Sequence, residues 1–237
     1  MSTPQPCLGR WVPLLKKTED KPDFSLLAKR IDELIAGDPQ AAQLADELKA
    51  EVANVATMRA ACIMPQQPDE MALERLKQYF RKLLMIKNCV PSCSMVFKWV
   101  CTVTPRGGGV FTSDPAVCKG GLGLELRAVA YQMAVCCAAI AARMAEGEQE
   151  QAKEASKWFK NAYFLFNHAR NNIEVDLHRD SELTRDLKPD VLLALSHVML
   201  AQNAGVFNHV ISQAAKAKFA KKSDAVEKHE IEKTVST

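Results

Sequence analysis

Residues 189–202 read PDVLLALSHVMLAQ and open the last long helix that the sequence predicts. Proline is favoured in the first turn of a helix, where its missing amide proton would have no partner. Apolar positions continue beyond the quoted stretch through Phe207 and Ile211. We therefore expect a helix from Pro189 to about Ile211, followed from Lys216 by a mostly charged tail.

Two further helices precede this one, separated from it by a polar connection at 172–188. The first covers 124–145 and is very rich in alanine, whose small side chain lets neighbouring helices approach closely. Gly147 ends this helix, and the next runs from about Gln149 to Asn171 with aromatic side chains as its bulk. Residues 122–215 are therefore expected to form helical hairpins.

The N-terminal region, residues 23–90, shows helical spacing three more times. Apolar side chains recur at three- and four-residue intervals, which is the pattern of one buried helix face. Glycine and proline interrupt this pattern at Gly37, at 65–69 and at Pro91. We expect a first helix that Asp23 or Ser25 caps and Gly37 ends, a second over 39–62 and a third over 71–90.

Residues 94–104 read SMVFKWVCTVT and are rich in β-branched and aromatic side chains. Phe97 and Trp99 fall on one face at a period of two, which predicts a strand. Residues 109–112 are its expected partner, and Leu14-Leu15 can supply a third strand. The predicted fold class is mainly α with a small antiparallel β-sheet. We expect one domain over 1–237, made of sheet segments at 11–18 and 94–112, N-terminal helices at 23–90, helical hairpins at 122–215 and a charged tail at 216–237.

The composition is that of an ordinary globular protein, with 48% hydrophobic and 25% charged residues. A net charge of +3 is too small to indicate a nucleic-acid-binding surface. No stretch reaches the roughly 18 consecutive apolar residues of a membrane span, and the N-terminus does not read as a secretory signal. A cytoplasmic location is therefore expected, where cysteines stay reduced.

The sequence shows no active site. Glycine-rich segments at 107–109 and 120–123 lack the Gly-Lys-Ser/Thr that follows in a phosphate loop, so they are interpreted as turns flanking a short strand. Cys89, Cys93 and Cys101 have no second ligand pair at zinc-site spacing. We expect no metal, no cofactor, no small-molecule substrate and no catalysis. A thiol-dependent enzyme remains the third alternative, because cysteine and histidine are both present.

A run of lysines begins the charged tail, at Lys216, Lys218, Lys221 and Lys222, interleaved with alanine and phenylalanine. Such a run can contact anionic lipid at a membrane surface. It is equally typical of a solvated helix end, where cations are favoured by the helix dipole. The sequence leaves both interpretations open.

Five segments, in order along the chain, resemble the Bro-one domain of Alix-type, ESCRT-associated adaptors. They are 14–18, 71–91, 97–99, 155–168 and 189–202. The last is the most specific, with Pro189-Asp190, Leu195-Ser196 and then Met-Leu-Ala-Gln as in the family motif. The chain departs from the family pattern at Cys101 and Cys136, and it resembles a divergent, C-terminally shortened version.

The resemblance implies a curved, boomerang-like helical domain with tetratricopeptide-like helix packing. It implies a non-catalytic adaptor or scaffold that binds the C-terminal amphipathic helix of an ESCRT-III subunit. Such a protein is cytoplasmic and is recruited to endosomes for multivesicular-body sorting. The alternative is a degenerate relative that has lost ESCRT-III binding and acts at membrane surfaces, or as a regulatory protein, through its lysine-rich tail.

The resemblance also implies partner-binding positions. They are an aromatic at Phe207, two positions four apart at Ala215 and Phe219, and an acidic contact at or near Glu150. Ala215 is small where the family has a larger aliphatic residue, so one anchor is reduced. Phe207 can alternatively be a core residue of the last helix.

Overall fold

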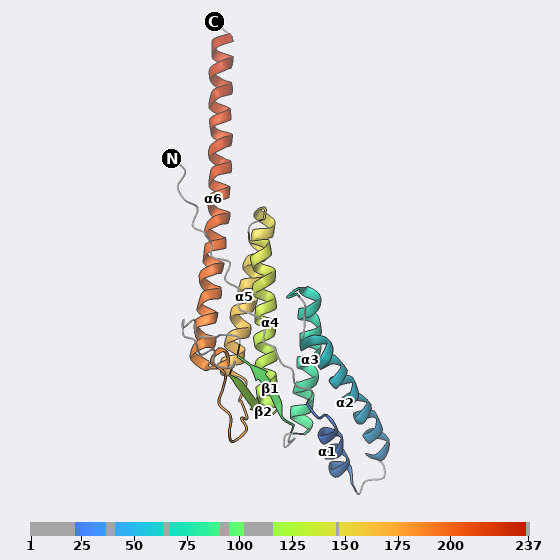
Figure 1. Cartoon of the computed structure of the whole chain (residues 1–237). Coiled ribbons are helices and arrows are strands. Elements are labelled where there is room, and N and C mark those ends of the chain that lie inside the picture. The colour runs from blue at the N-terminus through green and yellow to red at the C-terminus, as the bar shows by residue number, and fades with distance from the viewer. Residues whose placement is uncertain are drawn as a thin grey trace.

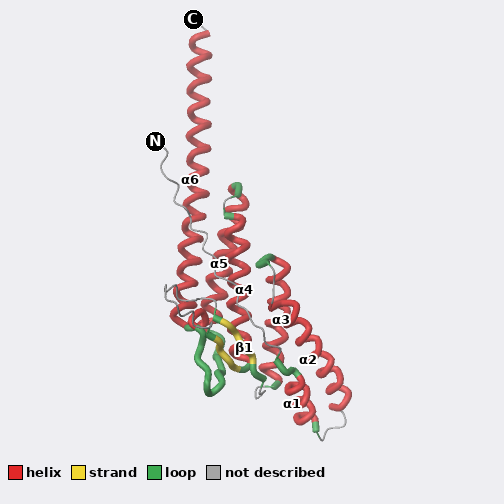
Figure 2. Tube along the Cα trace, viewed as in Figure 1, coloured by secondary structure: helices red, strands yellow, loops and turns green. Residues whose placement is uncertain are grey.

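The computed structural model of the chain describes residues 22–36, 41–63, 67–90, 95–101, 116–145 and 147–235. Within these ranges the chain is mainly helical with one small antiparallel sheet, so the predicted fold class is confirmed (Figure 2). The elements are α1 (Ser25–Ile35), α2 (Ala41–Ile63), α3 (Glu70–Cys89), β1 (Phe97–Val100), β2 (Val117–Gly120), α4 (Leu122–Met144), α5 (Gln149–Asn171), the 3-10 helix η1 (Arg185–Leu187) and α6 (Pro189–Val235).

The helices form a row in which each packs against its neighbours in sequence. Figure 1 shows α4, α5 and α6 side by side, with α3 and α2 beyond α4 and α2 inclined to the others. This is the nearest-neighbour arrangement of helical repeat folds. α6 continues far past the ends of α4 and α5, because the charged tail from Lys216 stays helical as far as Val235.

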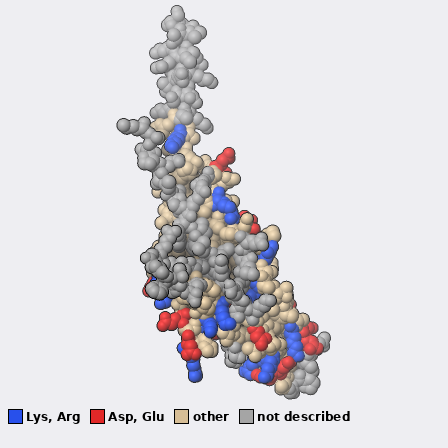
Figure 3. Space-filling model, viewed as in Figure 1, with Lys and Arg blue, Asp and Glu red and all other residues tan. Residues whose placement is uncertain are grey.

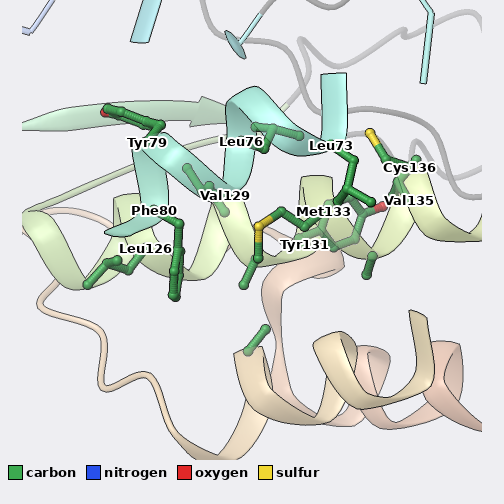
Figure 4. Close-up of a cluster of buried hydrophobic side chains, with 14 of the residues drawn as sticks. Leu73, Leu76, Tyr79, Phe80, Leu126, Val129, Tyr131, Met133, Val135 and Cys136 are labelled. Carbon is green, nitrogen blue, oxygen red and sulfur yellow. The ribbon is translucent and has the colours of Figure 1, made fainter. Parts of the chain in front are cut away.

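α4 is the central core helix. Every residue from Leu122 to Ala141 is buried. Its many alanines allow this, because small side chains let helices pack closely on more than one side. Figure 4 shows side chains of α3, among them Leu76 and Phe80, packed against Val129 and Met133 of α4.

The sheet pairs β1 with β2, with Phe97 opposite Gly120 and Val100 opposite Val117. Phe97 and Trp99 are both fully buried, which confirms the predicted period of two. Of the predicted strand 94–104, residues 95–101 are described, and β1 covers 97–100 of them. The predicted strands at 109–112 and at Leu14-Leu15 lie outside the described residues.

Candidate interaction surface

The glycine-rich turn before α4 binds a carboxylate of the same chain, that of Asp176. The backbone N–H groups of Gly123 and Leu124 donate to Asp176 Oδ1 at 2.9 and 3.2 Å, and Gly121 N–H donates to the Asp176 carbonyl at 2.9 Å. A Cβ on Gly121 would lie 2.2 Å from Asp176 Oδ2. A side chain at position 121 would therefore displace the Asp176 carboxylate, which caps the N-terminus of α4 and takes the place that a phosphate would need.

A second polar cluster is centred on Glu125 of α4, which is fully buried. Its carboxylate accepts hydrogen bonds from Arg59 Nε at 2.9 Å, Tyr79 Oη at 2.8 Å and Trp99 Nε1 at 2.7 Å. The Arg59 guanidinium also lies 5.4 Å from the centre of the Phe97 ring. Because both charges are paired and far from solvent, this cluster joins α2, α3, β1 and α4 rather than offering a site for substrate.

Three of the described cysteines are buried thiols that do not ionise readily. Burial raises the pKa of Cys136 and Cys137 to about 12, and that of Cys62 to about 11. Thiols of this kind stay protonated at neutral pH and are poor nucleophiles. Cys89 is exposed, while its predicted neighbour Cys93 lies outside the described residues. Among the residues that the structure describes, no group of three or more His, Cys, Asp or Glu could hold a metal ion.

The surface feature that remains is an exposed apolar line along α6. Residues 191–215 contain no Asp, Glu, Lys or Arg. Five of their side chains, at alternating spacings of three and four, face solvent, and we call them the α6 stripe: His197, Leu200, Ala204, Phe207 and Ile211. The large apolar members are 39% (Leu200), 60% (Phe207) and 51% (Ile211) exposed. Exposed apolar side chains arranged on one helix face indicate an interaction surface.

The α6 stripe is distinct from the face that α6 packs against α5. Leu192, Met199 and Val206, spaced by seven, are almost completely buried. Leu200 directly follows Met199, so the stripe lies about 100° around the helix from the buried face. Figure 3 shows charged side chains of both signs over the end of the molecule that α1 and α2 form.

Two described helices are long and apolar enough to cross a membrane by length and composition alone. One is α4, whose most apolar window is completely buried, so α4 is a core helix. The other is the segment Pro189–Phe219 of α6, whose most apolar window is 28% buried. This segment is apolar because residues 191–215, which carry the α6 stripe, contain no charged side chain.

The structure places three of the four expected partner-binding residues on α6. Phe207 is exposed, so the alternative of a core residue is wrong. Ala215 is half-buried, and Phe219 is 74% exposed on the part of α6 that continues past α5. At about 100° per residue, Phe219 lies about 120° around the helix from Phe207. The two phenylalanines therefore do not share one face of a straight helix.

Glu150 lies at the start of α5 and is exposed, with its carboxylate 2.5 Å from Lys153 Nζ. α5 and α6 form an antiparallel hairpin in which Ser156 Oγ and Asn203 Oδ1 are 2.5 Å apart. Glu150 lies six residues before Ser156, and His209 lies six residues after Asn203. The two are therefore at the same level of the antiparallel hairpin, close to Phe207 and Ile211 of the α6 stripe. The structure thus brings Glu150 near the level of Phe207 along the hairpin.

Ile211 and Leu200 are the exposed apolar residues that sequence reasoning did not assign to the surface. Both lie within about 40° of Phe207 around the helix, closer than Ala215 or Phe219. Their spacing of four and seven from Phe207, in a stretch without charges, is the signal that could have identified them.

The lysine-rich segment is helical and projects beyond α5. Lys216 and Lys218 are exposed. The side chains of Lys221 and Lys222 lie outside the described part of the chain, although the backbone there is helical.

Comparison with solved structures supports the fold. A structure described as an ALIX BRO1 CHMP4C complex matches with a TM-score of 0.69 and 26% identity, covering 87% of this chain and 57% of that chain. A second structure, described as the basis for endosomal targeting by the Bro1 domain, matches with a TM-score of 0.62 and 14% identity, covering 84% of this chain and 52% of that chain. The second likeness shows the fold alone.

The comparison with related sequences agrees with the comparison with solved structures. The human programmed cell death 6-interacting protein is 30% identical over 153 residues, which are 63% of this chain and 17% of the human protein. The Caenorhabditis elegans apoptosis-linked gene 2-interacting protein X 1 is 27% identical over 60% of this chain and 16% of its own length. The chain thus matches about one sixth of these relatives. A family model, the BRO1-like domain, matches residues 12–228. The chain therefore belongs to the BRO1-like domain family.

Proposed function

We propose that this chain is a non-catalytic adaptor module that binds a C-terminal amphipathic helix of an ESCRT-III subunit. In this role it is recruited from the cytoplasm to endosomes for multivesicular-body sorting. Two findings support the proposal. The family is a protein-interaction scaffold related to the ESCRT adaptor ALIX, and the similar ALIX structure is described as a complex with CHMP4C.

The observation that carries the proposal is the exposed pair Phe207 and Ile211, one helical turn apart on an uncharged face. Amphipathic helices bind through apolar anchors spaced by three, four and seven residues, which match such a pair. Burying a large apolar side chain contributes roughly 1.5–3 kcal/mol. A micromolar Kd corresponds to a binding free energy of about 8 kcal/mol, and two such anchors would supply a useful part of it.

The remaining expected residues have smaller roles in this proposal. Ala215 continues the line from Ile211 by four residues but offers little apolar area. Phe219 lies about 120° from Phe207, so it contacts the end of a partner helix that wraps around α6. Glu150, level with His209 along the hairpin, is positioned to pair with a basic residue of the partner.

A calorimetric titration tests this proposal. The wild-type chain should bind C-terminal helical peptides of ESCRT-III subunits, and the double variant Phe207→Asp, Phe219→Asp should lose at least tenfold in affinity, because a charge then replaces each apolar anchor. Ile211→Asp should weaken binding by a similar factor. The matched control is Phe164→Asp, since Phe164 is 63% exposed but lies on α5 outside the stripe.

No binding by a folded wild-type chain at high micromolar peptide concentration would contradict the proposal. Equal losses from Phe164→Asp and Phe207→Asp would also contradict it, because the effect would then not depend on the α6 stripe.

The second candidate function is contact with anionic membranes through the lysine-rich segment, and the exposure of Lys216 and Lys218 favours it. Basic residues near an anionic surface contribute about 1 kcal/mol each. Changing Lys216, Lys218, Lys221 and Lys222 to Glu should abolish sedimentation with phosphatidylserine-containing vesicles. If the variant and the wild type sediment equally, lipid contact through this segment is wrong.

A further inference from the structure

The connection between α5 and α6 contains a short sequence with the features of a protease recognition site. Residues 173–177 read Ile-Glu-Val-Asp-Leu and are not helical. Aspartate-specific cysteine proteases, the caspase class, cut the peptide bond after an aspartate, whose short carboxylate pairs with arginine in a basic pocket. Neighbouring subsites bind glutamate two residues earlier and an aliphatic side chain three residues earlier. Asp176 is the one aspartate of the sequence with glutamate two residues before it, and Ile173 supplies the aliphatic side chain.

The residues around this bond are largely accessible. Glu174 and Asp176 are exposed, and Leu177, which follows the bond, is 38% exposed. Residues 178–180 are exposed as well. Figure 2 shows the connection as a loop that projects beyond the end of the α5–α6 hairpin. Exposed loops with polar side chains are the preferred sites of proteolytic cutting.

In the folded chain the same segment is held against the start of α4. Arg127 Nη2 donates to the Ile173 carbonyl at 2.5 Å, and Gly121 N–H donates to the Asp176 carbonyl at 2.9 Å. The Asp176 carboxylate caps α4, and Ile173 is 5% exposed. A protease binds its substrate in an extended form, through backbone hydrogen bonds and pockets for individual side chains. The segment must therefore leave α4 before it can be cut.

This opening is local. Among residues 172–182, Ile173 is the one buried side chain. The segment can therefore detach while α4, α5 and α6 keep their packing against one another. Segments with so few buried contacts open at a much lower free energy than the whole fold.

We propose that the Asp176–Leu177 bond is a cleavage site for an aspartate-specific cysteine protease of the caspase class, cut when the connection opens. Hydrolysis adds one water molecule and leaves a carboxylate on Asp176 and an ammonium group on Leu177. The chain is then divided into 1–176 and 177–237, and the second fragment carries α6 with the α6 stripe. Only the packing of α6 against α5 holds this fragment in place, so cleavage makes the interaction surface able to dissociate.

Digestion of the 237-residue chain with a recombinant caspase that prefers Ile-Glu-Thr-Asp substrates, followed by mass spectrometry, tests the proposal. The expected products are 1–176 and 177–237. Asp176→Glu should slow cleavage at least tenfold, because the pocket has no room for one more methylene. Glu174→Arg should also slow cleavage, and it leaves the carboxylate that caps α4 in place. The matched control is Asp180→Glu, which makes the same change at an exposed aspartate of the same connection and should be cut at the wild-type rate.

The requirement for opening has its own test. A synthetic peptide of residues 170–181 has no α4 to leave, so it should be cut faster than the chain. Arg127→Met removes the donor to the Ile173 carbonyl and should speed cleavage of the chain about tenfold, because the open state is then more populated.

Three results would overturn the proposal. The first is a peptide that is not cut after Asp176. The second is a chain that stays intact, both as wild type and as Arg127→Met, under conditions in which the peptide is cut completely. The third is cleavage of the chain that Asp176→Glu does not slow.

Discussion

At the residue scale, Glu125 is a buried carboxylate whose three donors come from three different elements. Replacing it with alanine leaves the Arg59 guanidinium, which is 5% exposed, without the carboxylate that pairs with it. We expect Glu125→Ala to lower the free energy of unfolding by about 3–5 kcal/mol, because a buried charge loses its partner. Urea unfolding followed by circular dichroism measures this difference.

The control for this variant is Glu74→Ala on α3. Glu74 pairs with Lys77 at 3.6 Å, but both side chains are about half exposed. Surface pairs of this kind contribute about 0–1 kcal/mol. If the two variants lost the same stability, the Glu125 cluster would have no special structural role.

Because of Tyr79, the stability that the Glu125 cluster contributes should depend on pH. Burial, and then the negative charge of Glu125, raise the pKa of Tyr79 well above its ordinary value of 10.0. Above pH 10 the unfolded chain loses this proton while the folded chain keeps it, so the free energy of unfolding should fall as pH rises. Tyr79→Phe should remove this part of the slope. Urea midpoints of both proteins between pH 8 and 11 measure it, and identical slopes would show that Tyr79 does not contribute.

At the scale of elements, Asp176 connects the segment after α5 to the first turn of α4 and to the end of β2. Gly121→Ala should lower the free energy of unfolding by about 1–3 kcal/mol, because its Cβ would overlap Asp176 Oδ2. Asp176→Ala alone should lower the free energy of unfolding by about 1 kcal/mol, which is the usual contribution of a helix cap. The double variant should be more stable than the sum of the two losses predicts, because the overlap is gone. Additive losses in urea unfolding would show that the two residues do not interact.

The helices could be predicted from the sequence because each carries its own apolar spacing and its own breaks. The predicted second helix at 39–62, for example, corresponds to α2 at Ala41–Ile63. β2 could not be predicted in this way. Its four residues, VCKG, end in the glycine that the sequence indicates as a turn, and its pairing with β1 is a contact across the chain.

The candidate site was predictable only in part, for a related reason. The spacing of α6 shows which residues share a face, but the packing of α5 decides which face is covered, so the exposure of Phe207 was not evident from the sequence. Glu125 was missed because its donors lie 26, 46 and 66 residues away, with no local pattern to connect them.

At the scale of the whole molecule, α6 packs one face against α5 and leaves the α6 stripe exposed on another. Exposed apolar side chains on one helix face are typical of an interaction surface, so we expect the molecule to recognise other helices along the α6 stripe.

The order of the Glu125 contacts has a consequence for synthesis on the ribosome. Arg59, Tyr79 and Trp99 all precede their common acceptor in the chain, and domains generally fold from the N-terminus as they emerge. Until α4 leaves the exit tunnel, packing α2, α3 and β1 together would bury three donors with no acceptor, at about 1–3 kcal/mol each. The nascent N-terminal half should therefore stay unfolded until α4 is available. Residues 1–121 expressed alone should give an amide NMR spectrum without dispersion, so this region is not an independent folding unit.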